Sequence, residues 1–284
     1  MKAWYWTSLY YAVLPSMAMI LPPLLLFPEK FRKNFLGKVS FLLKPLTVKM
    51  LFPGLLKGQT YRIERDLHRP DSDRLYFVFG GNNNTCLEAE DILSQIPFCD
   101  DSRLTDDSLP RVTFPLMLMT DQEAYREKIL DLVSGYMKLF PNLKTVYLAG
   151  HSLGGAITLD IAQYLAQRYP HIKFQLSIDR TFSELWSVSE FTYGSIATSF
   201  MRKTFGLLWK FNSIRTIDDL KKCPNVSIFF YQVTPDEVLG PHALLCDALK
   251  KGSSLPISWK TEHQYVQDPE EELHAMPYRF LRKK

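Results

Sequence analysis

The stretch of this chain with the clearest chemical potential is TVYLAGHSLGGAITL, residues 145–159, in which Ser152 stands between Gly150 and Gly154. A run of β-forming residues precedes the serine and a helix-like run follows it. A sharp strand-to-helix turn presents a serine hydroxyl above the end of a sheet, and flanking glycines remove the clashes that such a turn would cause. The same turn aims the N–H of Leu153 at the group that the serine attacks. The spacing predicts a nucleophile; the alternative is a structural turn with an idle serine.

A serine nucleophile needs a base, and the base needs an orienting acid, in the chain order serine, acid, histidine for this kind of turn. The segment YQVTPDEVLGPHA, residues 231–243, offers Asp236 after a strand end and a proline. We predict that Asp236 is the acid. Glu237 is the neighbouring alternative, and a turn-forming role is the structural alternative for Asp236.

Two histidines are candidates for the base. In ISWKTEHQYV, residues 257–266, a strand-like alternation continues through His263, whose side chain would then point sideways from the sheet. His274 follows the polar loop QDPEEEL, residues 267–273, so we expect His274 to be the base. The loop is long, which leaves His263 open as the alternative.

The second donor of an oxyanion hole is expected after an earlier strand, in FVFGGNNNT, residues 77–85. Gly80 and Gly81 allow the backbone to approach a substrate closely. Asn82 occupies the position whose N–H would point into the hole, and an Asn-rich turn without function is the alternative.

Strands and helices must alternate along the chain to position these groups. The patterns predict strands at 60–67, 74–80, 112–120, 144–150, 172–179, 226–234 and 257–266, and helices at 85–96, 121–140, 152–169 and about 241–251, with a short helix after His274. Such alternation is typical of a mostly parallel, three-layer α/β sheet, whose active groups gather at the carboxyl ends of the strands.

Residues 182–222 interrupt this alternation. Their first thirty residues are rich in aromatic side chains and leucine. We predict a helical cap, about 182–222, that lies over Ser152 and forms an acyl-binding lid able to touch lipid. An ordinary packed helix pair is the alternative.

The N-terminal part differs in composition from the rest of the chain. Residues 3–28 carry no charge but hold four prolines, and residues 29–49 carry six Lys and Arg against one Glu. Prolines break a straight spanning helix, so we expect an interfacial or embedded membrane anchor with a basic collar, or else an arm packed on the domain. The predicted division is a membrane-associated segment at 1–57 and one α/β domain at 58–284.

Bulk composition excludes several classes of function. The chain has 284 residues, 46% of them hydrophobic and 23% charged, as in globular proteins. A net charge of +4 argues against a nucleic-acid binder. The four cysteines are scattered without CxxC spacing, and no cluster of His, Cys and Asp has the spacing of metal ligands, so no metal site is expected. No cofactor is expected either, and the oligomeric state is left open.

Several motifs resemble those of a known superfamily. GHSLGG at 150–155 in this strand order resembles the α/β-hydrolase superfamily of lipases, esterases and thioesterases over residues 58–284, and FGGNNN stands where many members have His-Gly-Asn. SIDRTFSEL at 177–185, WKFNS at 209–213 and PDEVL at 235–239 resemble membrane-associated members of the Bem46 and ABHD type. LHAMPYRFL at 273–281 resembles a terminal His-Asn-x-Pro-Leu pattern, with departures at Ala275 and Tyr278. The resemblance implies Asp236 as acid and His274 as base.

Residues and resemblance together predict a membrane-associated serine hydrolase. It would cleave a lipid-like ester or thioester through an acyl-enzyme formed by Ser152, His274 and Asp236, with no cofactor. An acyltransferase of the same fold and a non-catalytic binding module are the alternatives.

Overall fold

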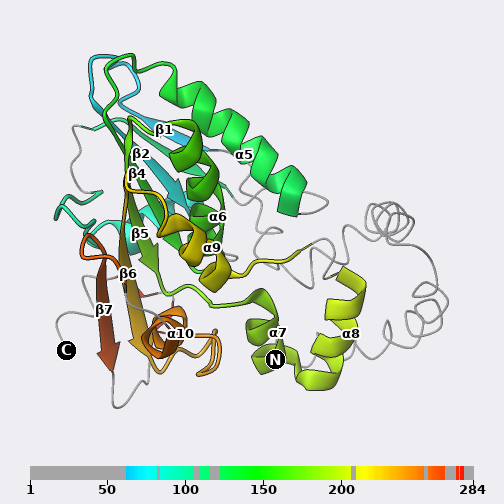
Figure 1. Cartoon of the computed structure of the whole chain (residues 1–284). Helices are drawn as coiled ribbons and strands as arrows, with labels where there is room; N and C mark the ends of the chain where they lie inside the picture. The colour runs from blue at the N-terminus through cyan, green and yellow to red at the C-terminus, as the bar shows by residue number, and fades with distance from the viewer. Residues whose placement is uncertain are drawn as a thin grey trace.

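The protein is described here by a computed structural model, which covers residues 62–81, 84–104, 109–115, 122–205, 209–252, 255–265, 273–274 and 276–277. Its centre is a sheet with the strand order β1-β3-β2-β4-β5-β6-β7 (Figure 1). The described strands are β1 (Ile63–Arg65), β2 (Arg74–Phe79), β3 (Arg111–Phe114), β4 (Thr145–His151), β5 (Lys173–Asp179), β6 (Val226–Thr234) and β7 (Lys260–Tyr265). Among these strands, only the edge strand β1 is antiparallel to its neighbour, β3; the other neighbouring strands are parallel.

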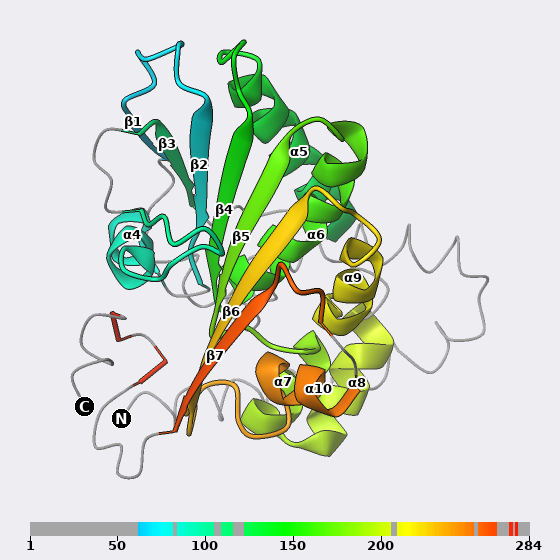
Figure 2. The same cartoon turned by 60° about the vertical axis from the view of Figure 1, so that its left-hand side comes forward.

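Helices cover both faces of this sheet. The helices of the described ranges are α4 (Cys86–Leu93), α5 (Gln122–Met137), α6 (Leu153–Arg168), α7 (Leu185–Tyr193), α8 (Ser195–Phe205), α9 (Ser213–Leu220) and α10 (Leu245–Gly252), of which α7 and α8 lie beyond the end of the sheet (Figure 1). Figure 2 shows α4 on one face and α5, α6 and α9 on the other. Parallel neighbours require crossover connections, which these helices supply. The predicted fold class, a mostly parallel sheet between two helical layers, is confirmed.

Strand β2 is apolar along most of its length because both of its faces are buried. Along β2, Leu75 and Phe77 pack in the core cluster shared with α5 and α6, whereas Tyr76 and Val78 pack in the cluster shared with α4. All four side chains are fully buried or nearly so. Burial on both sides explains why the sequence of β2 is a continuous apolar run rather than an alternation of apolar and polar residues.

Some element boundaries differ from those predicted. The strand predicted over 112–120 ends as β3 at Phe114, before Pro115, which lacks the N–H that a ladder needs; residues 116–120 lie outside the described part. The last strand begins at Lys260 rather than at residue 257. Before it, Trp259 is buried and its indole N–H donates to the Val226 carbonyl, at 3.2 Å.

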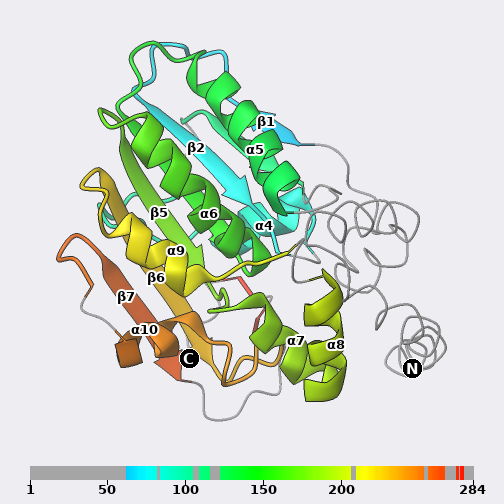
Figure 3. The same cartoon turned by 45° about the vertical axis from the view of Figure 1, so that its right-hand side comes forward.

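The interruption at 182–222 contains two different structures. Helices α7 and α8 pack against each other beyond the end of the sheet toward which the parallel strands point (Figures 1 and 3). Helix α9 instead packs beside α6 and buries Ile217 and Leu220 in the main core. The part of the predicted cap from 213 to 220 therefore belongs to the helical layer on the sheet.

Within the described ranges, no helix has the length and apolar character needed to cross a membrane. The apolar segment 3–28, the basic stretch 29–49 and the predicted domain boundary at 57 lie outside the described residues.

Candidate active site

Ser152 occupies the junction between β4 and α6. Its backbone has φ 53° and ψ −119°, in a region that side-chain-bearing residues rarely adopt. The turn is tight, because a Cβ added to Gly154 would lie 2.1 Å from the carbonyl oxygen of Phe79. The Ser152 N–H donates to the Asp179 carbonyl at 2.9 Å, and the Thr181 hydroxyl donates to the Ser152 carbonyl. The strained serine is therefore held from β5 as well as from its own strand and helix.

The chain after β2 passes directly beside this serine. A Cβ added to Gly81 would lie 3.1 Å from the Cβ of Ser152 and 3.0 Å from a ring carbon of His151. The Gly81 N–H donates to the Asn84 side chain at 2.9 Å, which folds the loop back on itself. Asn82 lies outside the described residues. Leu153 begins α6, so its N–H is among those at the helix N-terminus.

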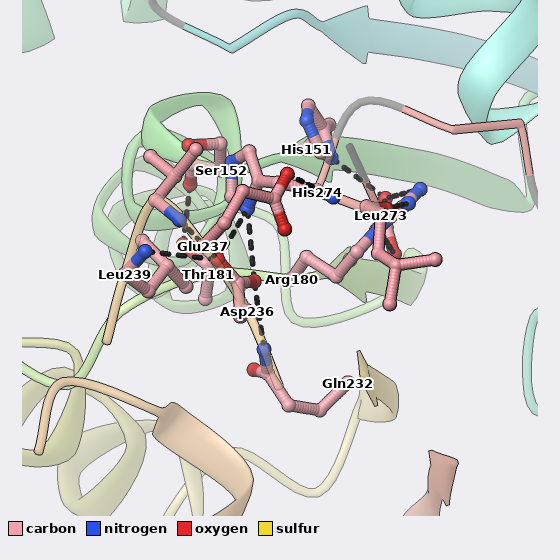
Figure 4. Close-up of polar contacts among 12 residues, drawn as sticks. His151, Ser152, Arg180, Thr181, Gln232, Asp236, Glu237, Leu239, Leu273 and His274 are labelled. Atoms are coloured by element: carbon pink, nitrogen blue, oxygen red, sulfur yellow. Dashed lines mark hydrogen bonds and ion pairs between the residues drawn. The ribbon is translucent and has the colours of Figure 1, made fainter. Parts of the chain in front are cut away.

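Asp236 and His274 are joined, although 38 residues separate them in the chain. The Nδ1 atom of His274 lies 3.0 and 2.9 Å from the two carboxylate oxygens of Asp236. The backbone N–H groups of Val238 and Leu239 donate to the same carboxylate, at 3.1 and 2.8 Å, as does the Gln232 amide at 3.4 Å (Figure 4). Both members of the pair are buried.

These contacts keep the carboxyl group ionised. Burial by itself would raise the pKa of Asp236, but the hydrogen bond and charge of His274 and the N–H groups of Leu239 and Val238 outweigh it and lower that pKa. An ionised carboxylate beside Nδ1 orients the imidazole ring of His274.

The order of these groups decides the fold type: a serine turn after β4, an acid after β6 and a histidine after β7, in a mostly parallel sheet. The chain has an α/β-hydrolase fold.

Solved structures to which this chain is similar include three proteins at low identity. A lipase-esterase related protein from Clostridium acetobutylicum is 12% identical, with a TM-score of 0.44 and coverage of 77% of this chain and 93% of that one. Est1E from Butyrivibrio proteoclasticus is 15% identical, with a TM-score of 0.46 and coverage of 72% and 82%. The esterase Pf2001 from Pyrococcus furiosus is 14% identical, with a TM-score of 0.46 and coverage of 75% and 84%. No protein-family model matches the sequence, and no curated protein matches it. The likeness to the Bem46 and ABHD type stays a prediction.

His263, the alternative base, lies elsewhere in this hydrolase fold. Its Nε2 atom lies 2.5 Å from the Thr234 hydroxyl. Its Nδ1 atom lies 3.3 Å from Asp247 and 3.2 Å from the Lys250 ammonium group. Both ring nitrogens are thus engaged within β6, α10 and β7, and the structure brings His274 rather than His263 to Asp236.

A second buried histidine–aspartate pair adjoins the serine, and the sequence did not assign it a role. The Nδ1 atom of His151 lies 2.7 Å from Asp179, and the guanidinium of Arg180 binds the same carboxylate, at 2.8 Å. Burial lowers the pKa of His151 to about 4, against the opposing influence of Asp179, so His151 is neutral at pH 7. The His151 and His274 rings lie 4.9 Å apart, centroid to centroid.

A signal for this cluster was present in the sequence. Asp179 is the last residue of β5 and Arg180 is the next residue, so two charged residues stand at the buried end of a strand. Charges in such a place are rarely buried unless they are paired.

The α7–α8 pair contacts the turn that carries Asp236. The ring of Phe191 lies against Gly240, where an added Cβ would be 2.4 Å from the ring. Phe191 and Ile196 on the helix pair, and Val238 on the turn, are also exposed to solvent. An apolar surface thus adjoins the predicted acid.

Among the described residues, no group of His, Cys, Asp and Glu could hold a metal ion.

Proposed function

We propose that this protein is a serine hydrolase in which Ser152, His274 and Asp236 form a catalytic triad. The observation that carries the proposal is the buried Asp236–His274 pair, together with a serine held in a strained turn at the same end of the sheet (Figure 4). A histidine oriented by a carboxylate is what activates a serine hydroxyl in this class of enzyme.

The mechanism is acyl transfer. The Oγ atom of Ser152 attacks the carbonyl carbon of the ester, and the Nε2 atom of His274 accepts the hydroxyl proton. The same proton passes to the leaving alcohol or thiol as the acyl–oxygen or acyl–sulfur bond breaks. Water then attacks the acyl-enzyme and gives one proton to His274, which returns it to Ser152. Asp236 stays ionised throughout and stabilises the imidazolium.

Backbone N–H groups stabilise the oxyanion in this proposal. Leu153 supplies one from the start of α6. The loop after β2 supplies the second, and the sequence assigns it to Asn82; the close approach of Gly81 to Ser152 supports a donor from this loop. Loss of one such donor costs about 10² to 10³-fold in kcat in serine hydrolases.

A lipid-like ester or thioester is the substrate class that we propose. The exposed side chains of Phe191, which lies against Gly240, and of Val238 adjoin the turn of Asp236, and Ile196 is exposed on the same helix pair; such side chains suit an acyl chain or a membrane surface. The uncharged segment 3–28 supports membrane association of the same protein.

Active-site labelling with a fluorophosphonate tests the proposal. The wild-type protein should react stoichiometrically, and Ser152→Ala should not react at all. His274→Ala should react at least about 10³-fold more slowly, because the base is lost. His263→Ala is the matched control and should react at close to the wild-type rate.

Two other functions are outcomes of this experiment. An unlabelled wild-type protein with intact folding would indicate a non-catalytic binding module and contradict the proposal. A labelled protein that forms esters with added alcohols in preference to free acid would indicate an acyltransferase.

A further inference from the structure

Arg180 follows directly after β5 and is fully buried. Its Nε and Nη2 atoms donate to the two carboxylate oxygens of Asp179, at 2.9 and 2.8 Å. Its Nη1 atom donates to two backbone carbonyls, those of Leu273 and Met276, at 2.7 Å each. One guanidinium thus joins the end of β5 to a segment more than ninety residues further along the chain.

The two carbonyls flank His274. The backbone N–H of His274 donates to the Glu237 carboxylate at 2.8 Å, and its ring is bound by Asp236. Leu273 is buried in the core cluster shared with α4. The described residues of this segment form a turn rather than a helix or strand. Side chains from other parts of the chain therefore set the place of this histidine.

The residues on either side of Arg180 hold the serine turn. The Asp179 carbonyl accepts the Ser152 N–H at 2.9 Å, and the Asp179 carboxylate binds His151 at 2.7 Å. The Thr181 hydroxyl donates to the Ser152 carbonyl. Three consecutive residues, 179–181, thus contact both the serine turn and the histidine segment.

The chemistry of this position explains why an arginine stands there. Without Arg180, the carbonyls of Leu273 and Met276 would each lose the hydrogen bond that its guanidinium donates. A guanidinium offers five N–H donors in a fixed plane, so it binds a carboxylate on one edge and two carbonyls on another, whereas the ammonium of lysine has three donors and no such plane. Burying this charge is costly, and Arg180 also has a φ of 41°, which is unfavourable for a non-glycine residue. A costly residue in a strained conformation indicates a positional requirement.

We propose that Arg180 is a positioning residue, with Asp179 as its counter-ion, that fixes His274 relative to Ser152. The inference rests on the proposed function, since it assigns the spacing of the base and the nucleophile to residues 179–181. Arg180 touches neither the substrate nor the reacting atoms. Its loss should therefore lower kcat and leave KM nearly unchanged, because a displacement of about 1 Å in a catalytic group can cost about 100-fold in rate.

The test compares Arg180→Gln and Arg180→Lys with two controls in the full-length protein. Leu165→Ala opens a cavity in α6, at the end of the helix far from Ser152, and lowers stability without touching residues 179–181. Arg215→Gln removes an exposed arginine. The readouts are kcat and KM on a soluble p-nitrophenyl ester, and hydrogen exchange of the peptide that contains His274.

We expect Arg180→Gln to lower kcat about 100-fold, to change KM less than about threefold, and to speed exchange around His274 selectively. Arg180→Lys should recover part of both losses. Leu165→Ala should lower the unfolding free energy without either effect. Arg180→Gln with unchanged exchange around His274, or Leu165→Ala with an equal loss of kcat, would overturn the proposal.

Two further outcomes are distinguishable. Arg180→Gln leaves Asp179 buried without its cation, so if that variant does not fold, Arg180→Lys decides: unchanged kcat and unchanged exchange would overturn the inference. If the wild-type protein neither hydrolyses esters nor reacts with a fluorophosphonate, the proposed function fails. Hydrogen exchange then decides by itself whether Arg180 holds the His274 segment.

Discussion

His151 is buried beside the carboxylate of Asp179. Replacing His151 with glutamine should reduce the loss of unfolding free energy that occurs when the pH is lowered. Burial lowers its pKa from 6.5 to about 4, while the hydrogen bond and charge of Asp179 oppose that shift. Between these two pKa values the unfolded chain binds a proton that the folded protein does not. The free energy of unfolding of the wild-type protein should therefore fall as the pH falls through this window.

The magnitude follows from the size of the shift. At about 1.4 kcal/mol per pKa unit, the full loss is about 3 kcal/mol, and about 2 kcal/mol of it falls between pH 7 and about pH 4.5. The favourable linkage of Asp179 and Asp236 lies at lower pH, because their pKa values are held below the ordinary 3.8. His263 contributes in the same direction as His151, since burial lowers its pKa too, but its contribution is common to the wild-type and the variant.

The assay is urea unfolding at both pH values, followed by tryptophan fluorescence. His151→Gln keeps an amide donor near Asp179 but cannot titrate, so its loss of stability on acidification should be about 2 kcal/mol smaller than that of the wild-type. His171→Gln, which removes an exposed histidine, is the matched control and should keep the wild-type loss. Equal losses in the wild-type and His151→Gln would refute the assignment.

Three further changes test other parts of the site. Asp236→Asn should lower kcat about 10⁴-fold. Glu237→Gln should lower kcat less than about 10-fold, because the new amide oxygen can still accept the backbone N–H of His274. Steady-state kinetics that rank the two variants in reverse would move the acid to Glu237. Deletion of residues 1–28 should abolish sedimentation with liposomes and spare turnover of soluble esters; unchanged sedimentation would contradict membrane association through this segment. Gly154→Ala should lower Tm and slow fluorophosphonate labelling, because the new Cβ would clash with the backbone at the end of β2. The control is Gly135→Ala, at an open position on α5. It should leave labelling unchanged and raise the unfolding free energy by about 0.5–1 kcal/mol.

The parts of the fold that were predictable from the sequence depend on local pattern. The apolar run of β2 is a short continuous pattern, and the apolar run of β4 lies next to the glycines around Ser152 in the chain. Such local patterns are sufficient to place a strand, a turn and a helix. His263 lies beside Thr234 and Lys250, as expected for a side chain that its position in a strand turns sideways from the sheet.

The parts that were not predictable depend on contacts between distant residues. Nothing near Arg180 in the sequence indicates that it binds the carbonyls of Leu273 and Met276. Likewise, aromatic content grouped α9 with the cap, whereas its packing on α6 depends on Ile217 and Leu220 meeting a face of another helix.

The strand order has a consequence for how folding of this protein can be followed. The loop of Gly81 follows β2, Ser152 follows β4, residues 179–181 lie at the end of β5, and Asp236 follows β6. These groups therefore meet only when four adjacent strands are paired in register. A slip of one residue between any two of these strands would turn a whole row of side chains to the opposite face. Such long-range parallel pairing forms slowly compared with local helices. If Ser152 reacts as we propose, the gain of fluorophosphonate reactivity during refolding counts the molecules whose sheet has reached the correct register, which the recovery of helical circular dichroism does not.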